Sequence, residues 1–554
     1  MILALALLLA AADPSAAYRE IDRARVSPDE ARARIATVVQ SLEDFAMPHS
    51  ATVLLAALAA DPAQSEGVRA AARERLAARA AGDGALAQLL IAEQGDPGKL
   101  PGAIAVAIAR GHLEVALRLA PVAEGAAFET MAQETSAAKV SAEARPLDKE
   151  LAGEMGLAAP NAPPVQASQP QQTVPGAAQR ELDLARAIAA SVAAGDPAEA
   201  DAREVAGLAA LAAGDSAGAT REFMAIVDLP VRRGDAAGLE RRDKAFLQLA
   251  RLAYQNGDDV LAARLYERVG RGAPEWLDAL FEASWAHFRR GEDEKALGNL
   301  LTLHAPFFQE RFFPESFVLK ALVLYENCRY ADARRALEEF QQRYQRLHDA
   351  LAQTLAGLPT PQSASELIAR GPVGLQQMIP AAAREEVARL EQAGDLRGAL
   401  ATAAQLAQEI DSIDRRPDPF RRSALIARVA PLARQARARL LETAGRKLLA
   451  RLDAERIALR ELIGQSLRLS YEIAGREKEL AGAAPDAALI AQPHKDPPPV
   501  ADDEELWPFQ GEYWRDELGS YRYQLGQRCR RPRTPLPTAA QQAPPAKVAE
   551  SPEN

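Results

Sequence analysis

The sequence predicts an all-α fold built from helical hairpins. Alanine makes up roughly one residue in five, runs of β-branched residues are scarce, and small residues recur with a period of 34 residues. Alanine and leucine favour helices because they lose little side-chain entropy there. A fixed period of this length is typical of an array in which each repeat is a pair of helices.

Composition and charge narrow the function classes. The chain has 554 residues, with 66 Lys and Arg against 76 Asp and Glu, which gives a net charge of −10. Such an acidic chain is poorly suited to coating nucleic acid, so we expect no nucleic-acid partner. After the first residues there is no apolar stretch of about 18 residues, so we expect no transmembrane span.

Residues 1–17 have features of a secretory signal peptide. Met1 to Ala10 is an apolar run, and the small residues up to Ala17 fit a cleavage site, although no basic residue precedes the run. We therefore expect export to the periplasm or cell envelope. The second hypothesis is a cytoplasmic protein in which this run starts the first helix. Cys328 and Cys529 could pair in an exported chain, and the sequence leaves this open.

Shifts in composition divide the rest of the chain into eight segments. Four of these segments have helical periodicity. The others are rich in proline or aromatic residues, or have the composition of a disordered tail. In order they are N-terminal helical repeats (28–130), a Pro/Gln-rich linker (131–178), the main repeat array (179–345), helical hairpins (346–431), one long helix (432–481), a Pro-rich connector (482–501), an aromatic docking segment (502–529) and a disordered tail (530–554). We expect loops near 229–242 and 357–372.

The repeat is clearest when turn glycines are aligned. Gly257 is followed by Ala262, and 34 residues later Gly291 is followed by Ala296 at the same offset. Small residues occupy the places where two antiparallel helices approach closely, and glycine permits the tight turn between them. The aligned turn positions are Gly214, Gly257, Gly291 and Cys328; small residues precede them at Gly207, Ala250, Ser284 and Ala321 and follow them at Ala219, Ala262, Ala296 and Ala333.

These positions resemble the tetratricopeptide repeat (TPR) family, whose 34-residue unit is a helical hairpin with small residues at the crossing points and a turn glycine. The resemblance covers about residues 200 to 345. It departs from the family pattern by nine extra residues between the first two units, by three before the fourth, and by Cys328 at a turn. Weaker units surround Gly111 and Gly394.

The resemblance implies a peptide-binding groove lined by the first helix of each hairpin. The implied groove combines an aromatic strip with two arginines, which suits an extended peptide or a helix with apolar anchors and a carboxylate. Its residues are Arg251, Tyr254, Phe281, Trp285, Phe288, Arg289 and Tyr325. In the alternative interpretation some of these aromatic residues belong to the core.

Two C-terminal features need a packing surface. Apolar residues from Leu448 to Ile473 follow a three-and-four spacing, interrupted at Glu455 and Ser466, so this helix either packs on its own chain or forms a coiled-coil dimer. The oligomeric state stays open.

The aromatic docking segment is predicted to dock in cis, and docking onto another protein is the alternative. Its aromatic residues are Trp507, Phe509, Tyr513, Trp514 and Tyr521. It is similar to an ending found in TPR proteins of myxobacteria, some of them linked to gliding motility.

No catalytic, metal or cofactor site is predicted. Gly214 to Gly218 matches the G-x-S-x-G spacing of hydrolases, but it falls at a helix-turn-helix corner without the preceding strand that a nucleophile elbow needs. The six histidines do not have the spacing of a helical zinc site. We expect a non-catalytic scaffold that binds a protein or peptide in a complex of the cell envelope. A motility complex is one setting that fits this expectation. The alternatives are a cytoplasmic adaptor and, more remotely, an envelope hydrolase with an unrecognised site.

Overall fold

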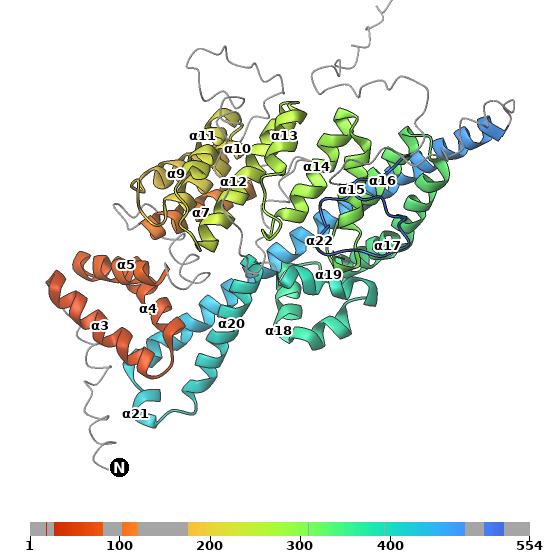
Figure 1. Cartoon of the computed structure of the whole chain (residues 1–554). Coiled ribbons are helices and arrows are strands. Elements are labelled where there is room, and N and C mark those ends of the chain that lie inside the picture. The colour runs from red at the N-terminus through yellow and green to blue at the C-terminus, as the bar shows by residue number, and fades with distance from the viewer. Residues whose placement is uncertain are drawn as a thin grey trace, which may run out of the picture. The chain divides into compact units, whose positions relative to one another are not determined.

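The computed structural model describes residues 18, 27–80, 102–119, 175–308, 310–392, 394–481 and 504–525. Every regular element in these ranges is a helix, which confirms the predicted all-α class (Figure 1). The predicted signal peptide, most of the linker, the tail and Cys529 lie outside these ranges. The chain divides into two compact units: unit 1 contains residues 1–136, 173–222 and 347–457, and unit 2 contains the remainder.

Unit 1 begins with α3 (Pro28–Asp44), α4 (Pro48–Ala60) and α5 (Glu66–Ala80). A capping box between Ser27 and Glu30 starts α3, and a proline in its first turn supplies the backbone angle of a helix. Helix α4 is apolar on nearly all sides, and most of its residues are buried. This burial explains why so polar a chain contains a helix without a hydrophilic face.

The second part of unit 1 contains α7 (Gly102–Leu119), α9 (Gly176–Ala190), α10 (Glu199–Ala212) and the first turns of α11 (Ser216–Asp228). Small and branched apolar residues of α7, α9 and α10 form one cluster. Because alanine dominates this cluster, the helix axes can approach closely.

The third part of unit 1 contains α18 (Pro361–Met378), α19 (Ala381–Glu391), α20 (Gly394–Ile413), the short α21 (Asp418–Arg421) and the first half of α22 (Ala424–Ala481). Residues of α20 and α22 share a core cluster with α3, α4 and α5, although hundreds of residues separate them in sequence. Unit 1 is therefore closed by segments that lie far apart in the sequence.

Two predicted boundaries in unit 1 are wrong. The long helix begins at Ala424 and not at 432. It continues through Pro431 because Leu425 and Val429, which lie in its first two turns, are buried in the core. The range predicted as a loop at 357–372 is mostly helical, because Thr360 and Pro361 give α18 a favourable N-terminus. Gly371, which has a φ of 57°, kinks this helix.

Unit 2 contains three successive hairpins. They are α12 (Ala236–Gln255) with α13 (Asp259–Tyr266), α14 (Trp276–Arg290) with α15 (Asp293–Leu303), and α16 (Pro314–Glu326) with the first part of α17 (Tyr330–Gly357). The short 3-10 helix η2 (Pro306–Phe308) precedes α16. The predicted loop near 229–242 is shorter than expected, because Asp235 caps α12 by accepting a hydrogen bond from the Gly238 N–H at 2.9 Å.

The turn positions of the repeat have the predicted geometry. Gly214, Gly257 and Gly291 have φ values of 78°, 80° and 76°, and Cys328 adopts the same left-handed region at 57°. The predicted small residues on both sides of these turns are buried. The hairpin register that the sequence predicts is therefore confirmed between residues 200 and 340.

Candidate partner-binding surfaces

The two arginines of the predicted groove already contact carboxylates of the chain. Arg251 on α12 forms a bidentate ion pair with Glu282 on α14, at 2.9 Å from Nε to Oε2 and 2.6 Å from Nη2 to Oε1. Arg289 pairs with Asp259 at 3.1 Å, and its guanidinium lies 4.4 Å from the centre of the Tyr254 ring. These arginines hold neighbouring hairpins together.

The predicted aromatic strip is only partly a surface. Phe288 is 1% exposed and lies in the core cluster of α14, α15, α16 and α17, so its assignment to the groove is wrong. Side chains of α15, α16 and α17 pack around it, which is why it is buried although it shares a helix face with Phe281. Phe281 and Trp285 are half-buried; Phe281 packs against Phe313 at 5.8 Å between ring centres.

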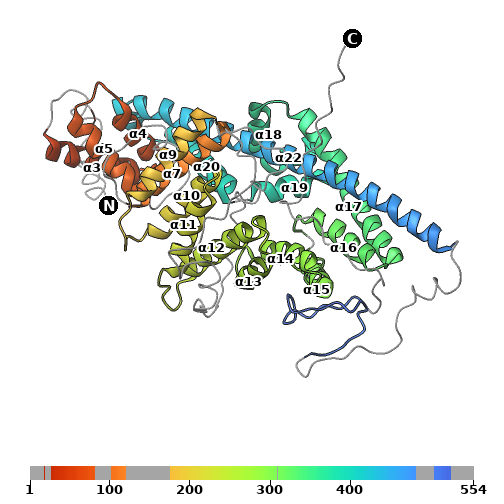
Figure 2. The ribbon, with the colours of Figure 1, turned by 90° about the horizontal axis from the view of Figure 1, so that it is seen from above.

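The last turns of α22 occupy the far end of the predicted groove. Within unit 2, Leu469 and Ile473 belong to the same apolar cluster as Trp285 and Tyr325. Figure 2 shows this part of α22 running beside α16 and α17. The chain therefore uses its own helix where a peptide ligand was expected.

Partly buried acids lie among these groove residues. Burial raises the pKa of Asp278 to about 6, and the neighbouring Glu282 carboxylate adds to the shift, whereas Arg251 opposes it. Burial also raises the pKa of Glu315, and the nearby Trp285 side chain opposes this shift. This surface is better suited to internal ion pairing than to binding an acidic peptide.

The aromatic docking segment belongs to unit 2 and contacts the helices of that unit. We call its described part, residues 504–525, the C-terminal strap. The Gly519 N–H donates to Thr302 Oγ1 of α15 at 2.8 Å, and the Tyr523 N–H donates to the Glu294 carbonyl at 3.0 Å. Figure 2 shows the backbone of the strap lying beside α15. Arg271 donates to the Asp516 carbonyl at 2.7 Å, and Arg329 donates to the Leu525 carbonyl at 2.9 Å.

The strap is anchored by one aromatic side chain that the sequence highlights, Tyr521, and by two leucines that it does not. Leu518, Tyr521 and Leu525 are buried, and the first two pack with Ala305. Trp507 stacks on Trp514 at 4.8 Å between ring centres, and the partly buried Tyr513 lies close to Phe509. Phe509 and Trp514 remain exposed. The indoles form an outer layer over the anchors.

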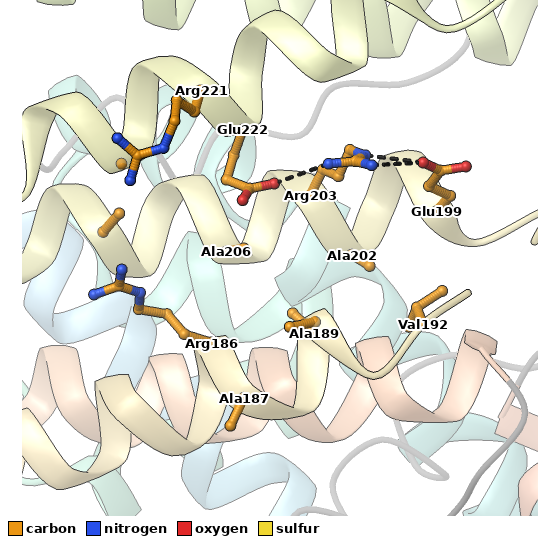
Figure 3. Close-up of a pocket in the computed structure, with 13 residues that line it drawn as sticks. Arg186, Ala187, Ala189, Val192, Glu199, Ala202, Arg203, Ala206, Arg221 and Glu222 are labelled. Carbon is orange, nitrogen blue, oxygen red and sulfur yellow. Dashed lines mark hydrogen bonds and ion pairs between the residues drawn. The ribbon is translucent and has the colours of Figure 1, made fainter. Parts of the chain in front are cut away.

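A pocket that the sequence did not indicate lies in unit 1 between α9, α10 and α11 (Figure 3). Its volume is about 480 Å³, and its walls consist mainly of alanine. Charged side chains stand around it: Arg186 on α9, Glu199 and Arg203 on α10, and Arg221 and Glu222 on α11. The pocket thus combines apolar walls with a polar rim.

The charges around this pocket are unequally paired. Arg203 contacts both acids, with 2.8 Å from Nη2 to Glu199 Oε1 and 3.3 Å from Nη1 to Glu222 Oε2. Arg186 contacts Asp215 through one nitrogen, at 3.1 Å. Arg221 forms no ion pair with any residue in the described part of the chain, and Figure 3 shows its guanidinium pointing toward that of Arg186. Two converging guanidinium groups with unused donors can bind a carboxylate.

The sequence contains the arginines of this pocket but no pattern that brings them together. The TPR resemblance directs attention to the first helix of each hairpin, but Arg186 and Arg221 lie on α9 and α11, which are not first helices of the aligned units. Their convergence depends on how three helices pack, and no spacing along one helix reveals it. The arginines themselves, among short alanine-rich helices, were the available clue.

The remaining sequence motifs have structural roles. Asp215 caps α11 by accepting a hydrogen bond from the Gly218 N–H at 2.7 Å, so the G-x-S-x-G match is a helix start. Residues 27–80, 102–119 and the later described ranges contain no cluster of three potential metal ligands. Within those same ranges no helix combines the length and apolar character that a membrane span requires.

Comparison with known proteins adds little to this description. No family model matches the chain, and no curated protein is similar to it. One solved structure, a "circular tandem repeat protein with novel repeat topology and enhanced subunit contact surfaces", is 17% identical over 81% of this chain and 78% of that chain. Its TM-score is 0.11, so we draw nothing from the likeness.

Proposed function

We propose that the chain is a non-catalytic, TPR-like scaffold that binds a protein partner in a bacterial cell-envelope assembly. An assembly for motility is one setting that fits this proposal. The partner presents a carboxylate on an extended segment to the pocket between α9, α10 and α11. The observation that carries this proposal is the convergence of Arg186 and Arg221 over alanine walls, with Arg221 unpaired in the described part of the chain.

The pocket favours a peptide carboxylate on physical grounds. A carboxylate accepts two parallel hydrogen bonds from a guanidinium, and two such groups on facing helices fix its position. Alanine side chains leave the pocket shallow, so that a backbone and small side chains can approach the helices. Arg203 is already satisfied by two acids and therefore acts as support for the rim.

Two observations support export. The apolar run at the N-terminus resembles a signal peptide, and Cys328 is disulfide-bonded. Disulfides form and persist mainly in oxidising compartments such as the periplasm. A cytoplasmic adaptor would not be expected to keep this bond.

The test is crosslinking and pull-down from native cells with matched variants. The pocket variant carries Arg186→Ala and Arg221→Ala. The control carries Arg180→Ala and Arg233→Ala, which remove the same charge from exposed sites outside the pocket. A partner captured by wild type and control but reduced at least about tenfold in the pocket variant supports the proposal.

The same samples test the alternatives. Equal capture by all three proteins would contradict binding at the pocket. A mature N-terminus near Asp13 or Tyr18 supports export, whereas an intact N-terminus in the cytoplasmic fraction would favour the adaptor hypothesis. An enzyme would show an activity abolished by a single substitution elsewhere, with the pocket variant fully active.

A further inference from the structure

The last part of α22 has two opposite faces. Leu462, Leu469 and Ile473 are buried, so the apolar seam that the sequence predicts is used within the chain. On the other side, Leu467 is 58% exposed and Tyr471 is 83% exposed. We call residues 460–479 on this side the outer face of α22. These two side chains are four residues apart and are therefore neighbours on the helix surface, so they form one exposed apolar patch.

Two glycines lie on the same face. At 100° per residue, Gly464 and Gly475 stand within about 80° of Leu467 and Tyr471 around the helix axis. Nothing lies within 4 Å of the position that a β-carbon would take at either glycine. Glycine in a helix interior costs about 1 kcal/mol relative to alanine. No contact described for the chain explains the absence of a side chain here, but close approach of a second helix does.

Charged residues flank this apolar strip. Glu461, Arg468, Glu472 and Lys478 are exposed, and none forms an ion pair with another described residue. Glu461 and Lys478 are 17 residues apart, which corresponds to about 25 Å along the helix. They cannot neutralise each other within one chain.

The pattern is self-complementary when reversed. In an antiparallel helix pair, residues face each other when their numbers add up to a nearly constant value. A sum near 939 places Gly464 opposite Gly475, Leu467 opposite Tyr471, Glu461 opposite Lys478 and Arg468 opposite Glu472. Small residues then meet small, apolar meet apolar, and every charge meets its opposite. A parallel pair would instead place each charge against itself.

We propose that the outer face of α22 binds the outer face of a second copy of this chain in an antiparallel, two-fold symmetric pair. Such an interface is isologous, since the same patch on both copies forms it. The contact spans about 27 Å of one helix per chain, and an interface this small gives a reversible dimer in the micromolar range. The proposal is independent of the pocket and of the function proposed for it.

The test is sedimentation of the full-length protein over a concentration series, with charge-reversal variants. Glu461→Lys alone and Lys478→Glu alone each place like charges opposite one another twice per dimer, and should weaken the dimer about tenfold or more. The double variant Glu461→Lys, Lys478→Glu restores the pairing and the wild-type dissociation constant. Since these residues are too far apart to touch in one chain, restoration has to come from contact between copies.

Two controls keep the test decisive. Arg434→Glu changes the net charge as much as Lys478→Glu, at an exposed site of α22 outside this face, and leaves dimerisation unchanged. Circular dichroism of each variant shows that the fold is intact. A wild-type protein that stays monomeric at about 100 μM, two orders of magnitude above the dissociation range of a micromolar dimer, overturns the proposal. A dimer insensitive to both single substitutions, or not restored by the double variant, also overturns it.

Discussion

The carbonyl oxygen of Tyr521 in the C-terminal strap lies against Gly298 of α15 so closely that a β-carbon at residue 298 would overlap it. Gly519 makes a second close contact, with the Trp276 ring. The fit of the strap on α14 and α15 therefore depends on two missing side chains, one on α15 and one on the strap. Glycine in a helix interior is normally unfavourable, and here close backbone approach accounts for it.

Gly298→Ala is expected to release the strap from α15. Alanine would normally stabilise a helix by about 0.5 to 1 kcal/mol, but the overlap with Tyr521 reverses the sign. Hydrogen exchange should show faster exchange at the Gly519 and Tyr523 amides, which donate to Thr302 and Glu294. Gly176→Ala is the control, because its β-carbon position is open. Unchanged protection of the strap in Gly298→Ala would contradict this close fit.

Tyr521→Ala should destabilise the strap more than Trp514→Ala. Tyr521 is 6% exposed. Its hydroxyl oxygen accepts a hydrogen bond from the Trp514 N–H at 2.8 Å, and its O–H donates one to the Trp514 carbonyl at 3.0 Å. Loss of a buried aromatic ring costs about 3 kcal/mol or more, and loss of an exposed one costs much less. Thermal unfolding of the two variants measures the difference. A larger effect from Trp514→Ala would show that the outer indole layer is the anchor.

Glu409→Gln should destabilise unit 1 by about 1 to 3 kcal/mol. The Glu409 carboxylate on α20 accepts four hydrogen bonds at the start of α4: from the His49 and Ser50 N–H groups at 2.9 and 2.8 Å, from the Ser50 hydroxyl at 2.6 Å, and from His49 Nδ1 at 2.8 Å. Glutamine replaces one acceptor oxygen with a donor. Asp411→Asn, an exposed carboxyl on the same helix, should have little effect.

The same carboxylate predicts a pH dependence. Burial favours a raised pKa for Glu409, but the hydrogen bonds from His49 and Ser50 together hold the pKa below its ordinary value of 4.5. The stabilisation is therefore complete above the unfolded-state pKa and is lost as pH falls through the lower folded-state pKa. Denaturant titrations between pH 7 and pH 3 should show a smaller loss for Glu409→Gln than for wild type. Parallel curves would contradict this assignment.

Asp278→Asn should stabilise unit 2 at neutral pH. Burial, with a contribution from Glu282, raises the pKa of Asp278 from 3.8 to about 6, so its charged form is unfavourable in the folded state. Stability is lost as pH rises from 3.8 to about 6, and asparagine removes this loss, a gain of about 1 to 3 kcal/mol at pH 7.5. The gain should disappear near pH 4. Glu338→Gln, an exposed control on α17, should change neither value.

The hairpins were predictable because their signals are local. Turn glycines such as Gly257 and Gly291 require positive φ, and alanines such as Ala262 permit close helix crossing, so a fixed offset in sequence reports both constraints. The start of α22 was not predictable by the same logic. Pro431 indicates a boundary locally, but burial of Leu425 and Val429 in tertiary contacts outweighs it.

The surfaces were less predictable than the fold. Helical spacing places Phe281, Trp285 and Phe288 on one face, but it does not show that neighbouring helices bury Phe288. Nor does it show that Arg251 meets Glu282 on another helix. The pocket at Arg186 and Arg221 arises from three helices together, and only their packing reveals it.

The most direct test of the proposed scaffold is photocrosslinking in native cells at the pocket wall. A photoreactive amino acid at Ala187, an exposed pocket residue, should give one defined protein adduct, whereas the same label at Leu184, exposed on α9 outside the pocket, should not. Adding Arg221→Ala to the Ala187-labelled chain should remove the adduct. Equal adducts at both sites, no adduct at Ala187, or an adduct insensitive to Arg221→Ala would contradict partner binding at this pocket.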